Sequence, residues 1–250
     1  MTPEPARAPS PATSPATYVV LAKAPVPGEV KTRLTSAYSP HEAAALAAAA
    51  LLDSLDAVRA AAGLAGPGGA HLVCALTGDL DRAAAPAALR TGLEGFRVVD
   101  QRGEGLAERI AAAHADAAAG TAGEHDGPTV QIGMDTPHAD PAVLARAAAR
   151  VGEPDGADAV LGLAEDGGWW LLALRRPADA SLLRDVPMST VRTGELTRAA
   201  LEAGGLRVEE APPLSDVDEP DDVLAVARLC PQTRFAALAG VLGGRTAVPA

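Results

Sequence analysis

Short apolar segments alternate with helical segments along most of this sequence, and this alternation limits the possible fold more than any other feature. Strands are predicted at residues 17–22, 71–77, 96–100, 129–134, 158–163, 169–174 and 206–211. Helices are predicted over residues 40–62, 105–119 and 193–203, with two more beginning at Pro141 and Pro220. Strands that alternate with helices form a mostly parallel sheet with helices on both faces. The chain is therefore predicted to be an α/β protein.

The start of the first long helix is marked by its own residues. Ser39 is a suitable N-cap, Pro40 occupies the first helical position, and Glu42 is placed to complete a capping box. A helix is therefore expected to begin at Pro40.

The composition argues against two classes of partner. Six aromatic residues provide little stacking surface for single-stranded nucleic acid, and a net charge of −11 repels phosphate backbones. No apolar run reaches the roughly 18 residues that span a bilayer. The two cysteines, Cys74 and Cys230, have no disulfide-framework or zinc-site spacing. We expect a soluble cytoplasmic protein without nucleic-acid or membrane partners, and the sequence gives no indication of its oligomeric state.

The ends of the chain differ from its middle. Residues 1–17 are rich in Pro, Ala, Ser and Thr and lack the apolar core of a signal peptide, so they are predicted to be a disordered tail. Residues 18–240 are predicted to form one folded domain, and residues 241–250 a flexible C-terminal tail.

Polar clusters follow five of the predicted strands. They are residues 23–33, residues 101–104, Asp135, Glu165 with Asp166, and residues 216–218. In α/β sheets of this kind, ligands bind at the carboxyl ends of the strands. A single site at one edge of the sheet is therefore predicted.

The first cluster contains both lysines of a chain that otherwise uses 19 arginines for its positive charge. Pro27 and Gly28 are expected to shape a tight loop, in which Lys23, Lys31 and Arg33 neutralise a polyphosphate on an otherwise acidic protein. The alternative is a solvated basic loop without a ligand.

Two aspartates occupy positions suited to a metal ion. Asp135 follows a buried strand, and Asp218 precedes the helix that begins at Pro220. Magnesium commonly takes one or two protein carboxylates beside phosphate oxygens and water. Alternatively, residues 216–222 serve only to cap that helix.

Two further loops carry polar groups. Gln101 and the glycine-rich turn to Gly105 open a helix, whose N-terminal amides are suited to a base or ribose, unless this is an ordinary glycine turn. Glu165 and Asp166 precede a tandem Trp169-Trp170, either as functional acids or as solvated acids of a two-glycine turn. Neighbouring residues of a strand point to opposite faces, so at least one tryptophan is expected in the core.

Four motifs together resemble a known family. They are Lys23-x-Pro with Lys31-Thr-Arg-Leu34, Gly133-Met-Asp-Thr-Pro137, Ala164-Glu-Asp-Gly-Gly168-Trp-Trp, and Asp216-Val-Asp-Glu-Pro-Asp-Asp222. Their order is that of an uncharacterised bacterial transferase family of the radical-SAM/selenodomain-associated type. This family belongs to the nucleotide-diphospho-sugar transferase superfamily, and the resemblance covers about residues 18–227. More distantly, the chain is similar to 2-phospholactate guanylyltransferase and molybdenum-cofactor guanylyltransferase.

The resemblance implies a glycosyltransferase-A-like fold, a three-layer αβα sandwich, and a nucleotide donor. It implies Mg²⁺ (or Mn²⁺) held by Asp135 and Asp218. Its implied nucleotide-binding residues are Ala22, Lys23, Gly28, Lys31, Arg33, Gln101 and Gly105. Its implied acceptor-binding residues are Glu165, Asp166, Gly168, Ser189 and Thr190. Glu165 or Asp166 is expected to orient an acceptor hydroxyl, accept its proton or bind a second metal.

The leading hypothesis is nucleotidyl transfer from a nucleoside triphosphate to a small anionic acceptor, with release of pyrophosphate. Lys31 and Arg33 would hold the outer phosphates and Lys23 the α-phosphate, with Asp166 as the fourth catalytic residue. Catalysis would consist mostly of positioning and charge neutralisation. The alternatives are sugar transfer from a nucleotide-sugar and a nucleotide-binding module without catalysis.

Overall fold

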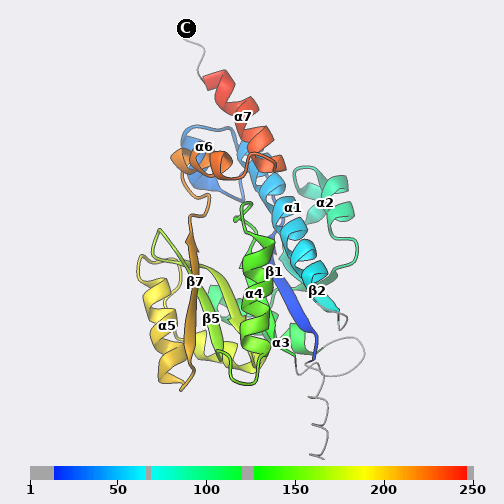
Figure 1. Ribbon diagram of the computed structural model, residues 1–250. Coiled ribbons are helices and arrows are strands. Elements are labelled where there is room, and N and C mark those ends of the chain that lie inside the picture. Colours follow the sequence, from blue (N-terminus) through cyan, green and yellow to red (C-terminus); the bar gives the residue numbers. More distant parts are fainter. Residues whose placement is uncertain (1–13, 66–68, 120–126, 247–250) are drawn as a thin grey trace, which may run out of the picture.

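A seven-stranded sheet forms the middle of the molecule in the computed structural model, which describes residues 14–65, 69–119 and 127–246 (Figure 1). The strands are β1 (Ala16–Lys23), β2 (Ala70–Thr77), β3 (Arg97–Asp100), β4 (Thr129–Gly133), β5 (Ala159–Ala164), β6 (Trp169–Leu174) and β7 (Val208–Leu214). The helices are α1 (Pro40–Leu64), α2 (Pro86–Gly92), α3 (Gly105–Ala118), α4 (Pro141–Gly152), α5 (Thr193–Ala203), α6 (Pro220–Leu229) and α7 (Arg234–Thr246). Three short 3₁₀ helices are η1 (Thr32–Ser36), η2 (Leu80–Arg82) and η3 (Pro177–Leu183).

The strand order is β3-β2-β1-β4-β6-β5-β7. Only β6 runs against its neighbours β4 and β5, and the other pairings are parallel. The prediction of a mostly parallel sheet is confirmed. Because β1, β2, β3, β4, β5 and β7 all point the same way, their carboxyl ends lie along one edge, which is where the predicted polar clusters begin.

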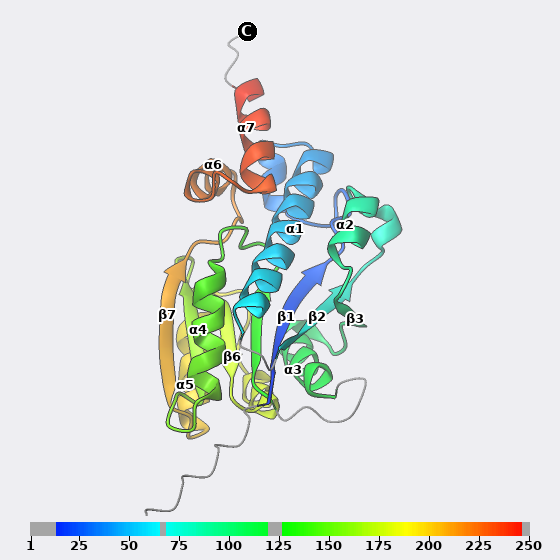
Figure 2. The same ribbon diagram turned by 45° about the vertical axis from the view of Figure 1, so that its right-hand side comes forward.

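Helices cover both faces of the sheet, so the predicted three-layer αβα arrangement is confirmed (Figure 2). On one face, Tyr18, Val20 and Ala22 of β1 belong to a core shared with α1 and α4. On the other face, Val19 packs with Ala113 of α3. The alternation of neighbouring β1 residues between two cores is the period of a strand buried on both sides.

The first long helix begins as the sequence predicts. The Ser39 side chain accepts a hydrogen bond from the Glu42 backbone N–H, and the Glu42 carboxylate accepts one from the Ser39 backbone N–H at 2.8 Å. Pro40 occupies the first turn. Helix α1 therefore starts with a complete capping box.

A second hydrophobic core, which we call the C-terminal core, lies beyond the edge of the sheet. It joins η1 and the first half of α1 to α6 and α7 through Leu34, Leu46, Val217, Val223 and Phe235. Figure 1 shows α6 and α7 above the sheet at the end that carries the polar clusters. This core positions two segments of the candidate site, the loop before Leu34 and the segment after β7.

The buried carboxylate of Asp53 anchors helix α7. It accepts hydrogen bonds from the backbone N–H groups of Arg234 and Phe235, at 3.2 and 2.8 Å, and pairs with the Arg234 guanidinium at 3.0 Å. A carboxylate at a helix N-terminus satisfies unpaired amides and complements the helix dipole. No element was predicted at α7, which begins at this anchor.

Both predicted tails include residues that the structure places in a strand or a helix. Ala16 and Thr17 belong to β1, where they pair with Ala70 and His71, so the N-terminal boundary at residue 17 was wrong. Residues 241–246 belong to α7, with Leu242 buried in the C-terminal core, so this part of the predicted C-terminal tail was also wrong. Residues 1–13 and 247–250 lie outside the described residues. Among the residues that the structure describes, no helix combines the length and apolar character needed to cross a membrane.

Candidate functional site

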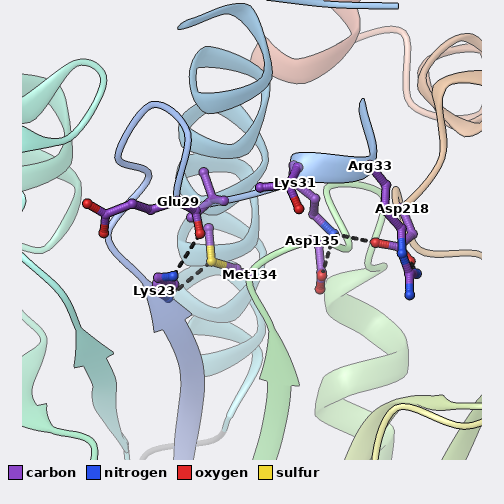
Figure 3. A pocket seen from close by; sticks show the side chains of 9 residues that line it. Lys23, Glu29, Lys31, Arg33, Met134, Asp135 and Asp218 are labelled. Atoms are coloured by element: carbon purple, nitrogen blue, oxygen red, sulfur yellow. Dashed lines mark hydrogen bonds and ion pairs between the residues drawn. The ribbon is translucent and has the colours of Figure 1, made fainter. Parts of the chain in front are cut away.

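A pocket of about 270 Å³ lies at the carboxyl ends of β1 and β4 (Figure 3). It is lined by Lys23, Glu29, Val30, Lys31, Thr32, Arg33, Met134, Asp135 and Asp218. The structure thus brings together the three cations that the sequence assigned to phosphates and the two aspartates that it assigned to a metal. We call these five side chains, Lys23, Lys31, Arg33, Asp135 and Asp218, the charged half of the site.

The loop after β1 is held by its own backbone. The Glu29 N–H donates to the Val26 carbonyl at 3.0 Å, and Gly28 adopts φ +81°, which glycine tolerates best. The Pro25 carbonyl accepts a hydrogen bond from the Ala84 N–H at 2.8 Å. The expected tight turn at Gly28 is therefore present, and it is tied to the neighbouring segment after β2.

Lys31 reaches across the pocket to both aspartates. Its Nζ lies 2.9 Å from Asp135 Oδ2 and 3.8 Å from Asp218 Oδ1, and its side chain is only 13% exposed. The Lys31 backbone has φ +45° and ψ +42°, a left-handed conformation that costs about 1–2 kcal/mol for a residue with a Cβ. Figure 3 shows the ammonium between the two carboxylates.

The remaining two cations differ in their partners. The exposed guanidinium of Arg33 forms an ion pair with Asp218, and its Nε lies 3.8 Å from Glu219. The Nζ of Lys23 instead donates to the Glu29 carbonyl at 2.7 Å. Arg33 therefore has a carboxylate partner and Lys23 a neutral one.

Asp135 is placed by its surroundings. A Cβ added to Gly133 would lie 2.7 Å from Asp135 Oδ1, so glycine leaves room for the carboxylate. The Val217 N–H donates to the Asp135 carbonyl at 3.4 Å. This bond connects the end of β4 to the segment that carries Asp218.

The residues around the start of α6 both cap this helix and contribute to the site. The Asp222 carboxylate accepts hydrogen bonds from the backbone N–H groups of Asp218 and Glu219, at 2.9 and 2.6 Å. Glu219 and Asp222 form the capping box. The capping alternative therefore holds for Glu219 and Asp222. The side chain of Asp218 instead pairs with Lys31 and Arg33, and its role as a metal ligand stays a prediction.

The pKa values of three charged groups in the site are shifted in different directions. Burial favours a lower pKa for Lys31, but its interactions with Asp135, Asp218 and Asp216 outweigh burial and raise it. Burial favours a higher pKa for Asp135, but Lys31 lowers it below its ordinary value. For Asp216, burial and the negative charges of Asp135 and Asp166 raise the pKa to about 6. Asp216 therefore releases its proton less readily than an ordinary carboxyl group does.

Gln101 lies at the same edge but is already engaged. Its Nε2 donates to the carbonyls of Ala22 and Ala75 at 2.7 and 2.9 Å, which leaves only the amide oxygen for a ligand. Gly105 begins α3 with φ +78°. The sequence-based alternative of an exposed glutamine in an ordinary turn does not describe this residue.

A second group of loops, residues 165–168 and 187–194, forms what we call the glycine half of the site. Gly167 has φ +89°, and a Cβ there would lie 2.0 Å from the Val191 carbonyl oxygen. The Gly194 N–H donates to the Gly167 carbonyl at 2.8 Å. Close backbone contact therefore holds these two loops together.

The acids and hydroxyls of the glycine half are mostly exposed. The Asp166 carboxylate accepts a hydrogen bond from the Gly168 N–H at 2.8 Å, and Glu165 accepts one from Ser215 at 2.6 Å. Ser189 has φ +58°, and the Thr190 hydroxyl lies 3.2 Å from that of Thr193. The Glu165–Ser215 bond connects this half to the segment of Asp216 and Asp218.

The tandem tryptophans divide as the strand period predicts. Trp170 is buried and its indole N–H donates to the Pro212 carbonyl at 3.0 Å, whereas Trp169 is half-buried. At least one tryptophan therefore belongs to the core, as expected.

The donor set fits a divalent cation only in part. Asp135 and Asp218 supply the hard oxygen ligands that Mg²⁺ or Mn²⁺ prefers, and both approach the same ammonium. Among the described residues, no three His, Cys, Asp or Glu side chains form a group that could hold a metal ion. Two carboxylates suit a cation whose other ligands are phosphate oxygens and water.

Sequence reasoning missed three contributors to the site. Met134 lines the pocket and accepts the Lys23 backbone N–H on its sulfur at 3.1 Å, the Glu29 carbonyl binds Lys23, and Ser215 binds Glu165. Met134 lies inside a recognised motif, and its position beside Asp135 was the available signal.

Comparison with known proteins gives a family and a fold. A family model described as "Uncharacterized protein conserved in bacteria (DUF2064)" matches residues 60–190. No curated protein matches the chain.

Solved structures agree on the fold. A proposed nucleotide-diphospho-sugar transferase from Desulfovibrio desulfuricans G20 is 22% identical, with a TM-score of 0.74 over 92% of this chain and 95% of that one. Rv0371c from Mycobacterium tuberculosis H37Rv, solved with manganese, is 21% identical, with a TM-score of 0.50 over 86% and 98%. CMP:2-keto-3-deoxy-manno-octonic acid synthetase, solved with CTP, is 14% identical, with a TM-score of 0.52 over 88% and 99%. The fold is that of the glycosyltransferase-A-like nucleotidyl and glycosyl transferases.

Proposed function

Because the chain belongs to the DUF2064 family of bacterial proteins, whose activity is not defined, we propose a function from the site itself, namely metal-dependent nucleotidyl transfer. An acceptor oxyanion would attack the α-phosphorus of a nucleoside triphosphate and form a new P–O bond. The bond from the α-phosphorus to the bridging oxygen would break, and pyrophosphate would leave. The products are a nucleotidylated acceptor and pyrophosphate.

One observation carries this proposal, the gathering of three cations and two carboxylates in a single pocket at the sheet edge. A triphosphate and a departing pyrophosphate require more positive charge than a nucleotide-sugar does. Lys31 and Arg33 are proposed to bind the outer phosphates and Lys23 the α-phosphate. Pre-arranged charge of this kind stabilises the charge that develops during transfer.

Asp135 and Asp218 are the proposed ligands of Mg²⁺ or Mn²⁺, which when bound neutralises phosphate charge. Two fold relatives support this assignment, since one was solved with CTP and another with manganese. Ala22, Gly28, Gln101 and Gly105 complete the proposed nucleotide site. In the Gln101 side chain the amide oxygen is left to bind the nucleotide, because Nε2 already donates to two backbone carbonyls.

The glycine half is proposed to bind the acceptor, which we infer to be a small anion. Glu165, Asp166, Gly168, Ser189 and Thr190 provide acids, hydroxyls and backbone groups there. Asp166 is proposed to orient the acceptor hydroxyl or to accept its proton. A cytoplasmic location suits a reaction that consumes nucleoside triphosphates.

The four sequence motifs also support a finer assignment within the family. On these motifs we propose a transferase of the radical-SAM/selenodomain-associated type, with a more distant relationship to the two guanylyltransferases named above.

Calorimetric titration with nucleoside triphosphates tests the metal pair. Binding by the wild type should require Mg²⁺ or Mn²⁺, and Asp135→Ala or Asp218→Ala should remove this metal dependence while circular dichroism shows an intact fold. Asp221→Ala, which removes an exposed carboxylate from the first turn of α6, is the matched control and should bind as the wild type does. Binding by both variants at wild-type strength that still requires the metal would refute the assignment.

Glycosyl transfer is the second candidate, because the relative from Desulfovibrio is a proposed nucleotide-diphospho-sugar transferase. The leaving group separates the two reactions, since nucleotidyl transfer releases pyrophosphate and glycosyl transfer releases a nucleoside diphosphate. Release of nucleoside diphosphate without pyrophosphate would favour the second candidate.

A further inference from the structure

Lys31 occupies the position where a cation bound by Asp135 and Asp218 would lie. Its ammonium is 2.9 Å from one carboxylate and 3.8 Å from the other. A divalent cation held by both carboxylates would draw on the same negative charge that now faces the ammonium. Lys31 and such a cation would therefore compete for the charge of this pair.

The inward direction of Lys31 is built into the backbone. A left-handed residue other than glycine costs free energy and persists only where its surroundings impose it. Here Val30 before it and Leu34 after it are buried, and the Leu34 N–H donates to the Lys31 carbonyl at 3.0 Å. These contacts fix the position from which the side chain reaches the carboxylates.

The two aspartates beside Lys31 carry like charges and are only partly screened by solvent, with side chains 31% and 32% exposed. Lys31, whose side chain is largely buried, supplies a compensating positive charge from within the chain.

We infer that Lys31 is a built-in counter-cation that excludes divalent metal from the Asp135–Asp218 pair until a polyphosphate draws its ammonium away. The inference rests on the proposed function. Polyphosphate is the natural competitor, because Lys23 and Arg33 line the same pocket and phosphate oxygens attract all three cations. The phosphates would also supply the metal ligands that two carboxylates lack. Metal and nucleotide then bind as one unit, each raising the affinity for the other.

Titration with Mn²⁺ alone, followed by electron paramagnetic resonance of the free ion, tests this role without any activity assay. Lys31→Met keeps the approximate length of the side chain and removes its charge. It should bind Mn²⁺ at least about tenfold more tightly than the wild type, a difference of about 1.4 kcal/mol. Lys31→Gln, which stays polar, should change the affinity in the same direction, and it replaces Lys31→Met if that variant does not fold.

Lys23→Met is the matched control. It removes the same charge from the same pocket, but Lys23 binds the Glu29 carbonyl rather than an aspartate. Its Mn²⁺ affinity should stay within about threefold of the wild type, since its ammonium binds a backbone carbonyl and does not compete for either aspartate. An equal gain in Lys23→Met and Lys31→Met would reduce the effect to net charge and overturn the inference.

Asp135→Asn separates failure of the inference from failure of the proposed function. If wild type and Lys31→Met bind Mn²⁺ equally and Asp135→Asn weakens both, the metal site stands and the counter-cation role is wrong. If Asp135→Asn changes Mn²⁺ affinity in neither background, the metal pair is wrong and the inference fails with it.

Discussion

The charged half and the glycine half of the site are held in place by opposite means. In the charged half, side chains hold one another, as Lys31 does with Asp135 and Arg33 does with Asp218. In the glycine half, backbone meets backbone, because Gly167 and Gly194 leave no space for a side chain. A ligand can replace the side-chain partners of the first half, whereas the backbone contacts of Gly167 and Gly194 cannot be exchanged without moving the loops. The charged half is therefore suited to respond to a ligand and the glycine half to keep its shape.

Gly167 offers the most severe test of this difference between the two halves. Gly167→Ala should destabilise the protein by roughly 2–5 kcal/mol, the sum of about 1–2 for a left-handed residue and about 1–3 for overpacking against Val191. Gly28→Ala in the charged half is the matched control, because its φ is +81° but nothing lies within 4 Å of the added Cβ. It should cost only about 1–2 kcal/mol. Urea unfolding of both variants measures the difference, and equal losses would contradict the contrast between the halves.

Substitutions in the charged half should lower turnover more than they lower stability. Lys31→Arg keeps the charge but replaces a compact ammonium with a planar fork. It should lower turnover by roughly tenfold, or about 1.4 kcal/mol, while the melting temperature stays near that of the wild type. Arg90→Lys, at an exposed ion pair with Asp81 outside the site, should change turnover by less than about twofold. Full activity of Lys31→Arg would mean that the pocket needs only positive charge.

The smallest expected effect is a pH-dependent change in the melting temperature. The pKa of Asp216 is raised from 3.8 to about 6 in the folded protein, so its ionisation costs stability as the pH rises through that range. Asp216→Asn removes this cost. Without metal ions, it should raise the melting temperature by about 2–4 °C at pH 8, since Asp216 is partly exposed to solvent, and by nothing at pH 4. A gain of the same size at both pH values would show that the charge of Asp216 is not its cause.

Most of the fold could be predicted because the pattern of each element is local. Alternation identified the strands, and Ser39, Pro40 and Glu42 identified the start of α1. The antiparallel direction of β6 also left a signal, since residues 165–168 are too few for the crossover that parallel strands need. Helix α7 was overlooked although Phe235, Ala239 and Leu242 repeat at helical spacing.

Five of the residues that line the pocket were singled out in the sequence, but the ion pairs among them were not. Asp135 and Asp218 were expected to hold a metal and Lys31 to hold phosphate, and no local pattern reveals that Lys31 faces Asp135, 104 residues away. The left-handed backbone of Lys31 was also unpredictable, because lysine has no preference for that conformation. Gln101 shows the same limit, since its partners are carbonyls of two strands that become neighbours only in the folded sheet.

The bridge between Lys31 and Asp218 also sets the moment at which this protein acquires its site during synthesis. The two residues are separated by 187 positions (218 − 31), which a ribosome adding about 5–20 residues per second covers in roughly 10–40 s. Until Asp218 is added, the nascent chain carries the cations Lys23, Lys31 and Arg33 but lacks at least one of the two carboxylates, and helices α6 and α7 are not yet made. Completion of the pocket is thus postponed until the last part of the chain has been made, because an incomplete chain lacks Asp218 from the pocket lining.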